Sequence, residues 1–262
     1  MIQECFRHFQ GIGPKTAAAL NENGFVSWDD CLTREEAIPF NGKRRNKLIE
    51  DIRKSRCALD SDDIDYFTAS FPTAEHWRIL GNYFPAATFI DLETTGLSRH
   101  CCHASVIAAF HRGEMYSFVY GENLDDFLLL ADAAELLVTF NGNSFDIPFL
   151  EKTFNIPSIG CAHVDLRWIA WHRGYRGGLK SIERQLGIRR PPHIDGIDGF
   201  EAVDLFFQWQ RGDASSRDRL ISYCKADVCS TYLIAERILR QSGCQIMHTD
   251  PDDLFSRFVR AD

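Results

Sequence analysis

The chain has 262 residues, which is enough for one large domain and a small one. Its apolar fraction of 45% and mean hydropathy of −0.23 are ordinary for a globular protein, and its most apolar stretch, residues 127–140, is too short and too charged to cross a bilayer. The net charge of −8 excludes a uniformly basic nucleic-acid-binding protein. The N-terminus lacks the long apolar core of a secretory signal, so we expect a cytoplasmic protein with no membrane partner.

Basic residues are nevertheless concentrated in two stretches. Residues 43–56 carry seven Lys or Arg side chains against two acidic ones, and residues 167–190 carry seven against one. Local positive patches on an acidic chain are what steering of a phosphate backbone requires, although such runs are more often solvated surface.

The nine cysteines are scattered, and the sequence contains no C-x-x-C pair. Zinc sites and disulfide frameworks need regular spacings, which this chain lacks. We therefore expect the cysteines to be reduced and to serve as small apolar core residues.

Residues 1–58 are expected to form a small all-α domain of short helices separated by tight turns. Residues 59–86 are acidic at first and then aromatic, and a helix is expected at residues 73–80. We interpret this second stretch as a connector that packs against the domain that follows.

A motif at residues 11–15 (GIGPK) precedes the helix-forming sequence TAAAL. Gly11 and Gly13 allow a tight turn, amides at the start of the next helix can face a phosphate, and Lys15 adds charge. The motif resembles the helix–hairpin–helix motif, which implies binding to a duplex backbone without reading its sequence. A weaker copy stands at residues 40–49, with Gly42 in the place of Gly13. A plain loop between packed helices is the alternative interpretation.

The large domain is expected at residues 87–242 and begins with strands. The pattern predicts a buried strand at residues 87–93, a hairpin at 104–120 with Gly113 in its turn, and another strand at 135–143. A helix follows at residues 144–154, with Asn143 or Ser144 as its N-cap.

Later segments of this domain alternate in the same way. Residues 163–171 fit a strand or a helix, whereas helical periodicity is clear at residues 178–188, 201–210 and 217–241. Three early strands followed by strand–helix alternation predict an α/β fold with a mixed sheet flanked by helices. The tail at residues 243–262 carries no signal that we can interpret.

Four carboxylates stand out in this domain. Asp91 and Glu93 lie two apart at the end of an apolar strand, so both side chains point to one face. Asp227 falls within the apolar stripe of the last long helix, and Asp146 within the apolar run 145–150. A strand-end acid pair alone is unremarkable, and a single buried Asp is often satisfied by a cap or an Arg. Two buried Asp residues together with the pair are harder to explain separately.

A convergent cluster of four carboxylates would not stay ionised unaided, because like charges raise carboxyl pKa values. Divalent cations relieve this repulsion, and oxygen ligands without His or Cys select Mg²⁺ or Mn²⁺. Two such ions can clamp the attacking and leaving oxygens of an in-line phosphoryl displacement.

Three motifs in order resemble the DEDD superfamily of 3′→5′ exonucleases, and the arrangement is most similar to the YprB-type RNase-H-like branch. They are FIDLETTGLS with Asp91 and Glu93, NGNSFDIPFL with Asp146, and YCKAD with Tyr223 and Asp227. The resemblance covers roughly residues 70–240 and implies an RNase-H-like fold preceded by the helical domain.

The resemblance also implies roles for these residues. Asp91, Glu93 and Asp227 would hold a first metal ion, Asp91 would bridge to a second, and Asp146 would support the second through water. Tyr223 would orient the attacking water. The histidine subclass would need His at position 222, where this chain has Ser, so the tyrosine subclass is implied.

Contacts with nucleic acid are less sharply indicated. Asn141 and Asn143, in the turn before Asp146, are candidates for the 3′-terminal nucleotide, although ordinary turn residues are the simpler interpretation. His163, Asp165 and His193 fall near the same region without an assigned role.

The sequence therefore predicts a two-metal 3′→5′ exonuclease acting on nucleic acid, with DNA favoured by the helix–hairpin–helix resemblance and RNA open. Two other hypotheses remain: a non-catalytic nucleic-acid-binding scaffold, and a nuclease that trims RNA or cuts a structured substrate.

Overall fold

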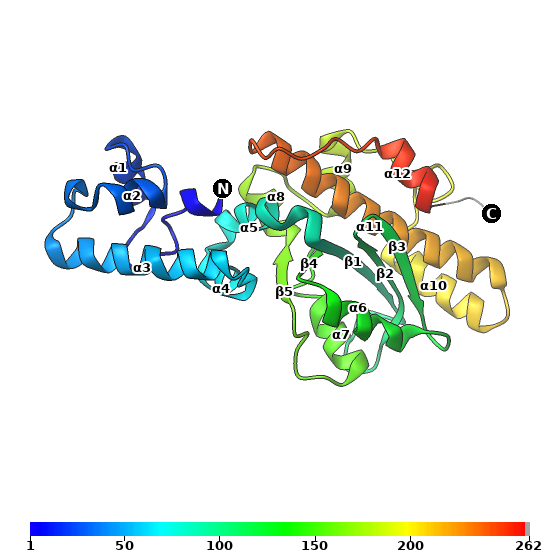
Figure 1. Ribbon diagram of the computed structural model, residues 1–262. Coiled ribbons are helices and arrows are strands. Elements are labelled where there is room, and N and C mark those ends of the chain that lie inside the picture. The colour runs from blue at the N-terminus through cyan, green and yellow to red at the C-terminus, as the bar shows by residue number, and fades with distance from the viewer. Residues whose placement is uncertain (260–262) are drawn as a thin grey trace. The chain divides into compact units, whose positions relative to one another are not determined.

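The computed structural model describes residues 1–259 (Figure 1). The chain divides into two compact units, Met1–Phe84 and a second that begins at Pro85. Most of the stretch interpreted as a connector, residues 59–86, groups with the first unit. The tail at 243–262 belongs to the second unit, and its last three residues lie outside the described part.

The first unit is helical. Its α-helices are α1 (Pro14–Glu22), α2 (Trp28–Thr33), α3 (Gly42–Asp60), α4 (Ile64–Ser70) and α5 (His76–Tyr83). Three short 3-10 helices accompany them: Ile2–Glu4 precedes α1, Glu35–Ala37 follows α2, and Thr73–Glu75 precedes α5. The helix expected at residues 73–80 is thus a 3-10 turn that leads into α5.

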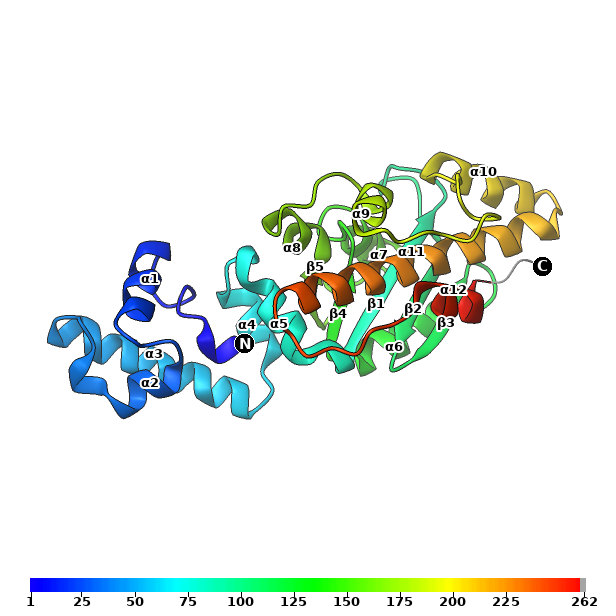
Figure 2. The same cartoon turned by 90° about the horizontal axis from the view of Figure 1, so that it is seen from above.

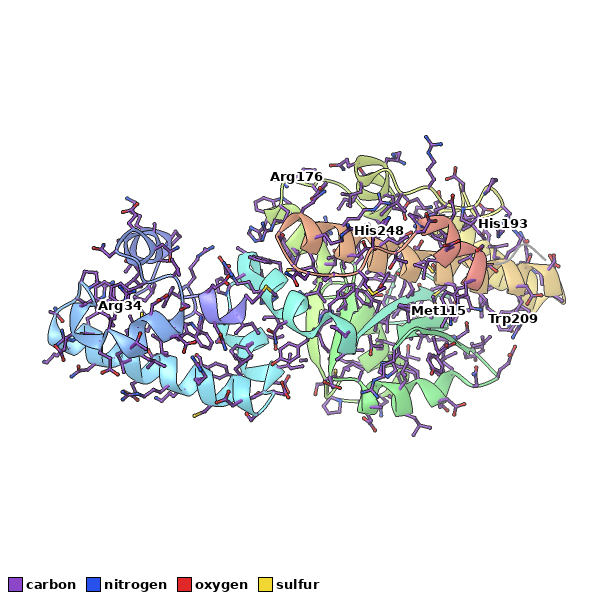
Figure 3. The ribbon with its side chains drawn as sticks, turned by 45° about the horizontal axis from the view of Figure 1, so that its top comes forward. Arg34, Met115, Arg176, His193, Trp209 and His248 are labelled. Carbon is purple, nitrogen blue, oxygen red and sulfur yellow. The ribbon has the colours of Figure 1, made fainter. Side chains whose placement is uncertain are left out.

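Trp28 anchors the core of this unit. Its side chain is fully buried, and its indole N–H donates to the carbonyl oxygen of Cys5 at 2.8 Å. Ser27 forms a capping box with Asp30 at the start of α2. Arg34, labelled in Figure 3, donates to the carbonyl of Gly24 at 2.5 Å and lies over the ring of Phe25, so the turn after α1 is held from outside.

The second unit contains a five-stranded mixed sheet. Its strands are β1 (Ala87–Thr94), β2 (Ala104–His111), β3 (Glu114–Val119), β4 (Leu136–Thr139) and β5 (Ala162–Asp165), in the order β3-β2-β1-β4-β5. The pairs β3-β2 and β2-β1 are antiparallel, and β1-β4 and β4-β5 are parallel. Arg112 and Gly113 both adopt positive φ in the turn of the predicted hairpin.

Helices cover both faces of this sheet. They are α6 (Phe127–Ala133), α7 (Asp146–Phe154), α8 (Leu166–His172), α9 (Leu179–Leu186), α10 (Gly199–Gln210), α11 (Ala214–Gln241) and α12 (Pro251–Phe258). Figure 1 shows α11 along one face, with α6 and α7 on the other. Seen from above in Figure 2, α9 and α10 lie beside α11, against which both pack. The α/β fold class with a helical region before it is confirmed.

Alternation along β1 gives its two faces different chemistry. Ile90 and Leu92 point into the apolar core with Phe127 of α6 and Leu150 of α7. The residues that alternate with these two point to the α11 side, where Phe89 makes an edge-to-face contact with the ring of Tyr232 on that helix. The strand therefore packs one face into the apolar core and turns its other face toward α11.

Three local expectations gain detail or change. The N-cap of α7 is Phe145, so the expectation of Asn143 or Ser144 is wrong. Ser144 is instead committed to the preceding turn, because its hydroxyl donates to the backbone carbonyl of Asn141 at 3.1 Å. The ambiguous segment at 163–171 is the end of β5 followed by α8, and the tail contains α12.

The cysteines are all free, as expected. Five are buried and four are partly or fully exposed, so core packing explains only some of them. Within residues 1–259, none of the helices combines the length and apolar character that spanning a membrane requires.

Candidate functional site

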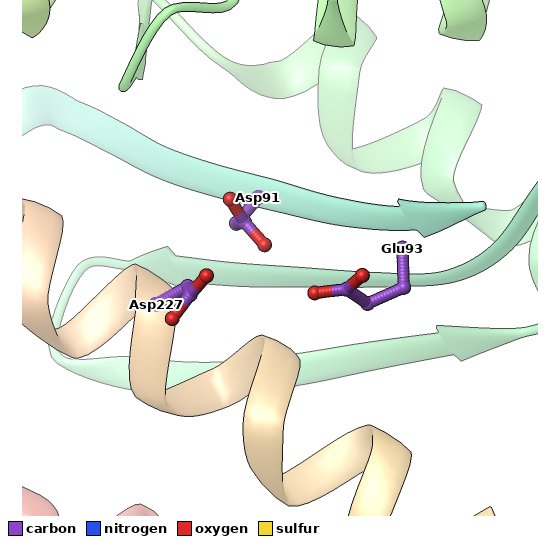
Figure 4. A group of neighbouring side chains, drawn as sticks. All are labelled: Asp91, Glu93 and Asp227. Carbon is purple, nitrogen blue, oxygen red and sulfur yellow. The ribbon is translucent and has the colours of Figure 1, made fainter. Parts of the chain in front are cut away.

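Strand β1 and helix α11 bring three acidic side chains together. Asp91 and Glu93 project from the strand toward α11, and Asp227 projects back from the helix (Figure 4). One ligand oxygen from each carboxylate lies within 4.8 Å of the other two. Among the described residues this is the group of acidic, His or Cys side chains that has the spacing of a metal site.

The apolar stripe of α11 explains why Asp227 faces inward. Leu220, Cys224 and Ile234 on this stripe are buried, and the helical period places Asp227 between them. Cys224 donates through its thiol to the backbone carbonyl of Asp91 at 3.3 Å, which links helix and strand beside the carboxylates. Tyr223, one turn before Asp227, is 4% exposed.

The fourth carboxylate, Asp146, is the first residue of α7 and is 3% exposed. It is not a member of the group of three, but its charge acts on both Asp91 and Glu93. The turn before it is compact, since a Cβ on Gly142 would meet the buried Thr139 side chain at 2.0 Å. Only glycine therefore fits at that point of the turn.

Asp165 organises the same turn from β5. Its carboxylate accepts hydrogen bonds from the backbone N–H groups of Asn141 at 2.8 Å, Asn143 at 3.2 Å and Arg167 at 3.0 Å. Asn141 has a positive φ of 72°. Its side-chain oxygen accepts from Arg167 and Ser144. Asp165 is thus a positioning residue for the segment that leads to Asp146.

Burial raises the pKa of Asp91 and of Glu93 well above ordinary carboxyl values, and the charges of Asp227 and Asp146 raise both further. Burial also raises the pKa of Asp227, although nearby Arg190 opposes that shift. For Asp146, burial and then the charges of Asp165 and Asp227 raise the pKa to about 7. The metal-free cluster therefore resists full ionisation.

Tyr223 responds to the same environment. Burial first, and then the carboxylates of Asp227, Glu93 and Asp91, raise the pKa of its phenol far above the ordinary value. The ammonium of Lys180 lies 5.1 Å from the centre of the tyrosine ring. The phenol stays protonated and can donate a hydrogen bond.

These residues fit a divalent cation. The three candidate ligands supply only carboxylate oxygens. Oxygens bound to one hard cation, at about 2.0–2.6 Å from it, lie no more than about 4–5 Å apart, which matches the observed spacing. Without His or Cys among the ligands, Mg²⁺ or Mn²⁺ suits the site better than Zn²⁺.

The sequence singled out some of these residues and missed others. Asp91, Glu93 and Asp227 come together, Asp146 and Tyr223 lie within electrostatic reach of them, and their roles stay predictions.

The residues that the sequence did not assign are Arg190, Glu183, Lys180, Cys224 and Asp165. Arg190 had counted only as one member of a basic run. Nothing in the one-dimensional pattern separates it from Arg189, its neighbour.

The candidate nucleic-acid-binding residues of the first unit surround the start of α1. Gly11 has a φ of 77°, Gly13 is the N-cap without a side-chain hydrogen bond, and Lys15 is exposed. Arg44 donates to the carbonyl of Gly11 at 2.9 Å.

Most charges of the nearby basic run at residues 43–56 are neutralised. Five of its seven cations make ion pairs with carboxylates: Arg45, Lys47, Arg53, Lys54 and Arg56.

Comparison with known proteins agrees with this architecture. The sequence profile of the RNase_H_2 family, described as RNase_H superfamily, matches residues 88–239, more than half of the chain. The chain belongs to the RNase_H superfamily. This membership confirms the RNase-H-like fold, and the group of three carboxylates lies inside the matched region.

Solved structures with similar folds include the family B DNA polymerase from the hyperthermophilic archaeon Pyrobaculum calidifontis. It is 18% identical, with a TM-score of 0.49 over 58% of this chain, which spans 24% of the polymerase. A second structure, the apo form of a nuclease, is 20% identical with a TM-score of 0.42, and the match covers 68% of this chain and 82% of that one. No curated protein matches the chain.

The raised pKa of Asp146 predicts a pH-dependent loss of folding stability in the metal-free protein. Because folding raises this pKa from its ordinary 3.8 to about 7, the folded state binds the proton more tightly than the unfolded chain. That stabilisation is complete below pH about 4 and is lost as the pH rises to about 7. We expect Asp146→Asn to remove this loss, so that the melting temperature of the variant exceeds that of the wild type by an amount that grows over this window to the order of 10 °C.

The measurement is thermal unfolding in EDTA at several pH values. Asp132→Asn is the matched control, because Asp132 is exposed on α6 of the same unit. If the melting temperatures of Asp146→Asn and the wild type change in parallel with pH, the predicted loss of stability is contradicted.

Proposed function

We propose that the chain is a metal-dependent 3′→5′ exonuclease that hydrolyses phosphodiester bonds by a two-metal mechanism, with DNA as the favoured substrate. The observation that carries this proposal is the group of three buried or partly buried carboxylates, spaced for a cation, inside an RNase_H superfamily domain. A protein that only bound nucleic acid would gain nothing from burying these acids against one another.

Each residue has a distinct part in this proposal. Asp91, Glu93 and Asp227 would hold one ion, Asp91 would also help to hold a second, and Asp146 would support the second. When bound, two divalent ions supply Lewis-acid stabilisation of charge on the phosphate oxygens. Tyr223, kept protonated by its surroundings, donates a hydrogen bond that orients the attacking water.

The exonuclease assignment rests on the resemblance to the DEDD superfamily. The tyrosine subclass is inferred because Ser222 stands where the other subclass has histidine. Asn141 and Asn143 are the proposed contacts to the 3′-terminal nucleotide. The exposed position of Asn143 supports its part, whereas the side-chain oxygen of Asn141 is already hydrogen-bonded.

For the first unit we propose a helix–hairpin–helix module that binds a duplex backbone. The start of α1 supports this, since a helix N-terminus without a side-chain cap has free amides that attract phosphate. Gly11 and Gly13 leave open space there, because a Cβ on either would meet nothing within 4 Å. Lys15 and Lys43 are the cations that we assign to phosphate contact. The cytoplasmic location stays a prediction from the sequence.

Digestion of 5′-labelled substrates tests the catalytic proposal. We expect single-stranded DNA, duplex DNA or RNA, incubated with Mg²⁺ or Mn²⁺, to give a ladder that shortens from the 3′ end, and EDTA to abolish it. Asp91→Asn should slow cleavage by about 10³-fold or more, because the metal-held charge stabilisation is worth several kcal/mol.

Asp132→Asn, which changes an exposed acid, should cleave like the wild type. Internal fragments without a ladder would favour a structure-specific endonuclease. Absence of cleavage of every substrate by folded, Mn²⁺-loaded protein would favour the binding scaffold.

Tyr223→Phe tests the water-orienting role. Loss of the hydroxyl should slow turnover by about 10- to 100-fold, because misplacing a reactant by about 1 Å costs that much. Mn²⁺ affinity, measured by calorimetry, should stay at the wild-type value because the tyrosine is not a ligand. Unchanged turnover would remove the assigned role.

Salt dependence of duplex binding tests the first unit. Each lost phosphate contact lowers the slope of log K against log salt by about 0.9, so Lys15→Gln/Lys43→Gln should lower it by about 2 between about 50 and 200 mM salt in EDTA. Lys54→Gln is the control, because Lys54 on the same helix as Lys43 is paired with Glu50. An unchanged slope in the double variant would rule out a phosphate-binding role for these lysines.

A further inference from the structure

Arg190 is a buried cation beside the carboxylate group. It lies in the extended segment after α9, and its side chain is 2% exposed. A buried guanidinium is costly unless it is paired, and here two carboxylates meet it.

Glu183 on α9 holds one side of the guanidinium. Arg190 Nε donates to both carboxylate oxygens of Glu183, at 2.9 and 3.1 Å, and Nη2 donates to Glu183 Oε1 at 2.5 Å. The Glu183 side chain is itself only 5% exposed. This two-point contact fixes the plane of the guanidinium and offsets part of its charge.

The other side of Arg190 faces Asp227. Nη1 makes an ion pair with Asp227 Oδ1, although the two atoms are not aligned as a hydrogen bond. The guanidinium carbon also lies 5.8 Å from the centre of the Tyr223 ring, so Arg190 reaches two residues of the candidate site.

Stability alone does not explain this arrangement. Buried ion pairs add little net stability compared with apolar residues of similar size, because their desolvation is expensive. A carboxylate has two oxygens, so Asp227 can rest one against Arg190 and offer the other to a cation. Partners of this kind orient metal ligands, and losing them typically lowers metal affinity about 10- to 100-fold.

We propose that Arg190, held by Glu183, is a positioning residue that fixes the Asp227 carboxylate for metal binding. The inference rests on the proposed function in taking Asp227 as a ligand. Glu183 offsets part of the charge, and Arg190 holds Asp227 through the fixed geometry of its guanidinium. Lysine keeps the charge but lacks the planar fork, so it cannot bridge both carboxylates in the same way.

The experiment measures Mn²⁺ binding to the full chain by calorimetry without substrate, and the melting temperature of the metal-free protein. The variants are Arg190→Lys and the double variant Glu183→Met/Arg190→Met, which removes both charges of the Glu183–Arg190 pair together. We expect both to bind Mn²⁺ about 10-fold or more weakly. The control is Glu122→Met/Arg217→Met, which removes another ion pair made by α11 and should leave the affinity unchanged.

The outcomes separate this inference from the proposed function. Wild-type or tighter Mn²⁺ affinity in both Arg190 variants would overturn the positioning role, even with a lowered melting temperature, because that pattern describes a purely structural pair. Failure of the wild-type chain to bind Mn²⁺ would overturn the metal site and this inference together. Weakened affinity in the Arg190 variants with normal affinity in the control supports the role.

Discussion

The burial of like charges between β1 and α11 is the constraint on which the second unit depends. Asp91, Glu93 and Asp227 occupy positions that an apolar interface would otherwise fill, and their raised pKa values express the cost. The fold tolerates this because packing elsewhere fixes both elements. The opposite face of β1 packs into an apolar core, and apolar residues before and after Asp227 anchor α11. Apolar packing around the site thus offsets the energetic cost of burying these carboxylates.

The pairing register of β1 keeps its acidic side chains out of the apolar core. Because side chains alternate along a strand, a slip of one residue would turn Asp91 and Glu93 into the apolar core with α6 and α7. Antiparallel pairing with β2 along nearly the whole strand and parallel pairing with β4 at its start both oppose such a slip. The β1–β2 pairing becomes irregular between Glu93 and Thr94, just past the second acid. The hydrogen-bond ladder is therefore regular along the residues that carry the carboxylates.

Periodic patterns predicted most of the fold and the acidic part of the site. A spacing of two placed Asp91 and Glu93 on one face, and the stripe of α11 turned Asp227 inward, because both rest on fixed local geometry. Long-range pairing could not be predicted in this way. Arg190 and Arg189 are alike in the sequence, and only the chain path after α9 makes the former a buried partner of two carboxylates. The missed cap of α7 has the same origin, since contacts with β5 shape the turn before it.

Under the proposed function, the charge balance at the site couples the binding of metal ions to the binding of the nucleic-acid substrate. Without metal, Asp91, Glu93, Asp146 and Asp227 present negative charge to a polyanion, and Arg190, which Glu183 also pairs, offsets only part of it. Two divalent ions would cancel four carboxylates and remove that repulsion. Metal binding then raises the affinity for nucleic acid, and by thermodynamic reciprocity nucleic acid raises the affinity for metal. Under the proposed function, an acidic chain would therefore bind a phosphate backbone at this site without a basic surface, and only with the ions present.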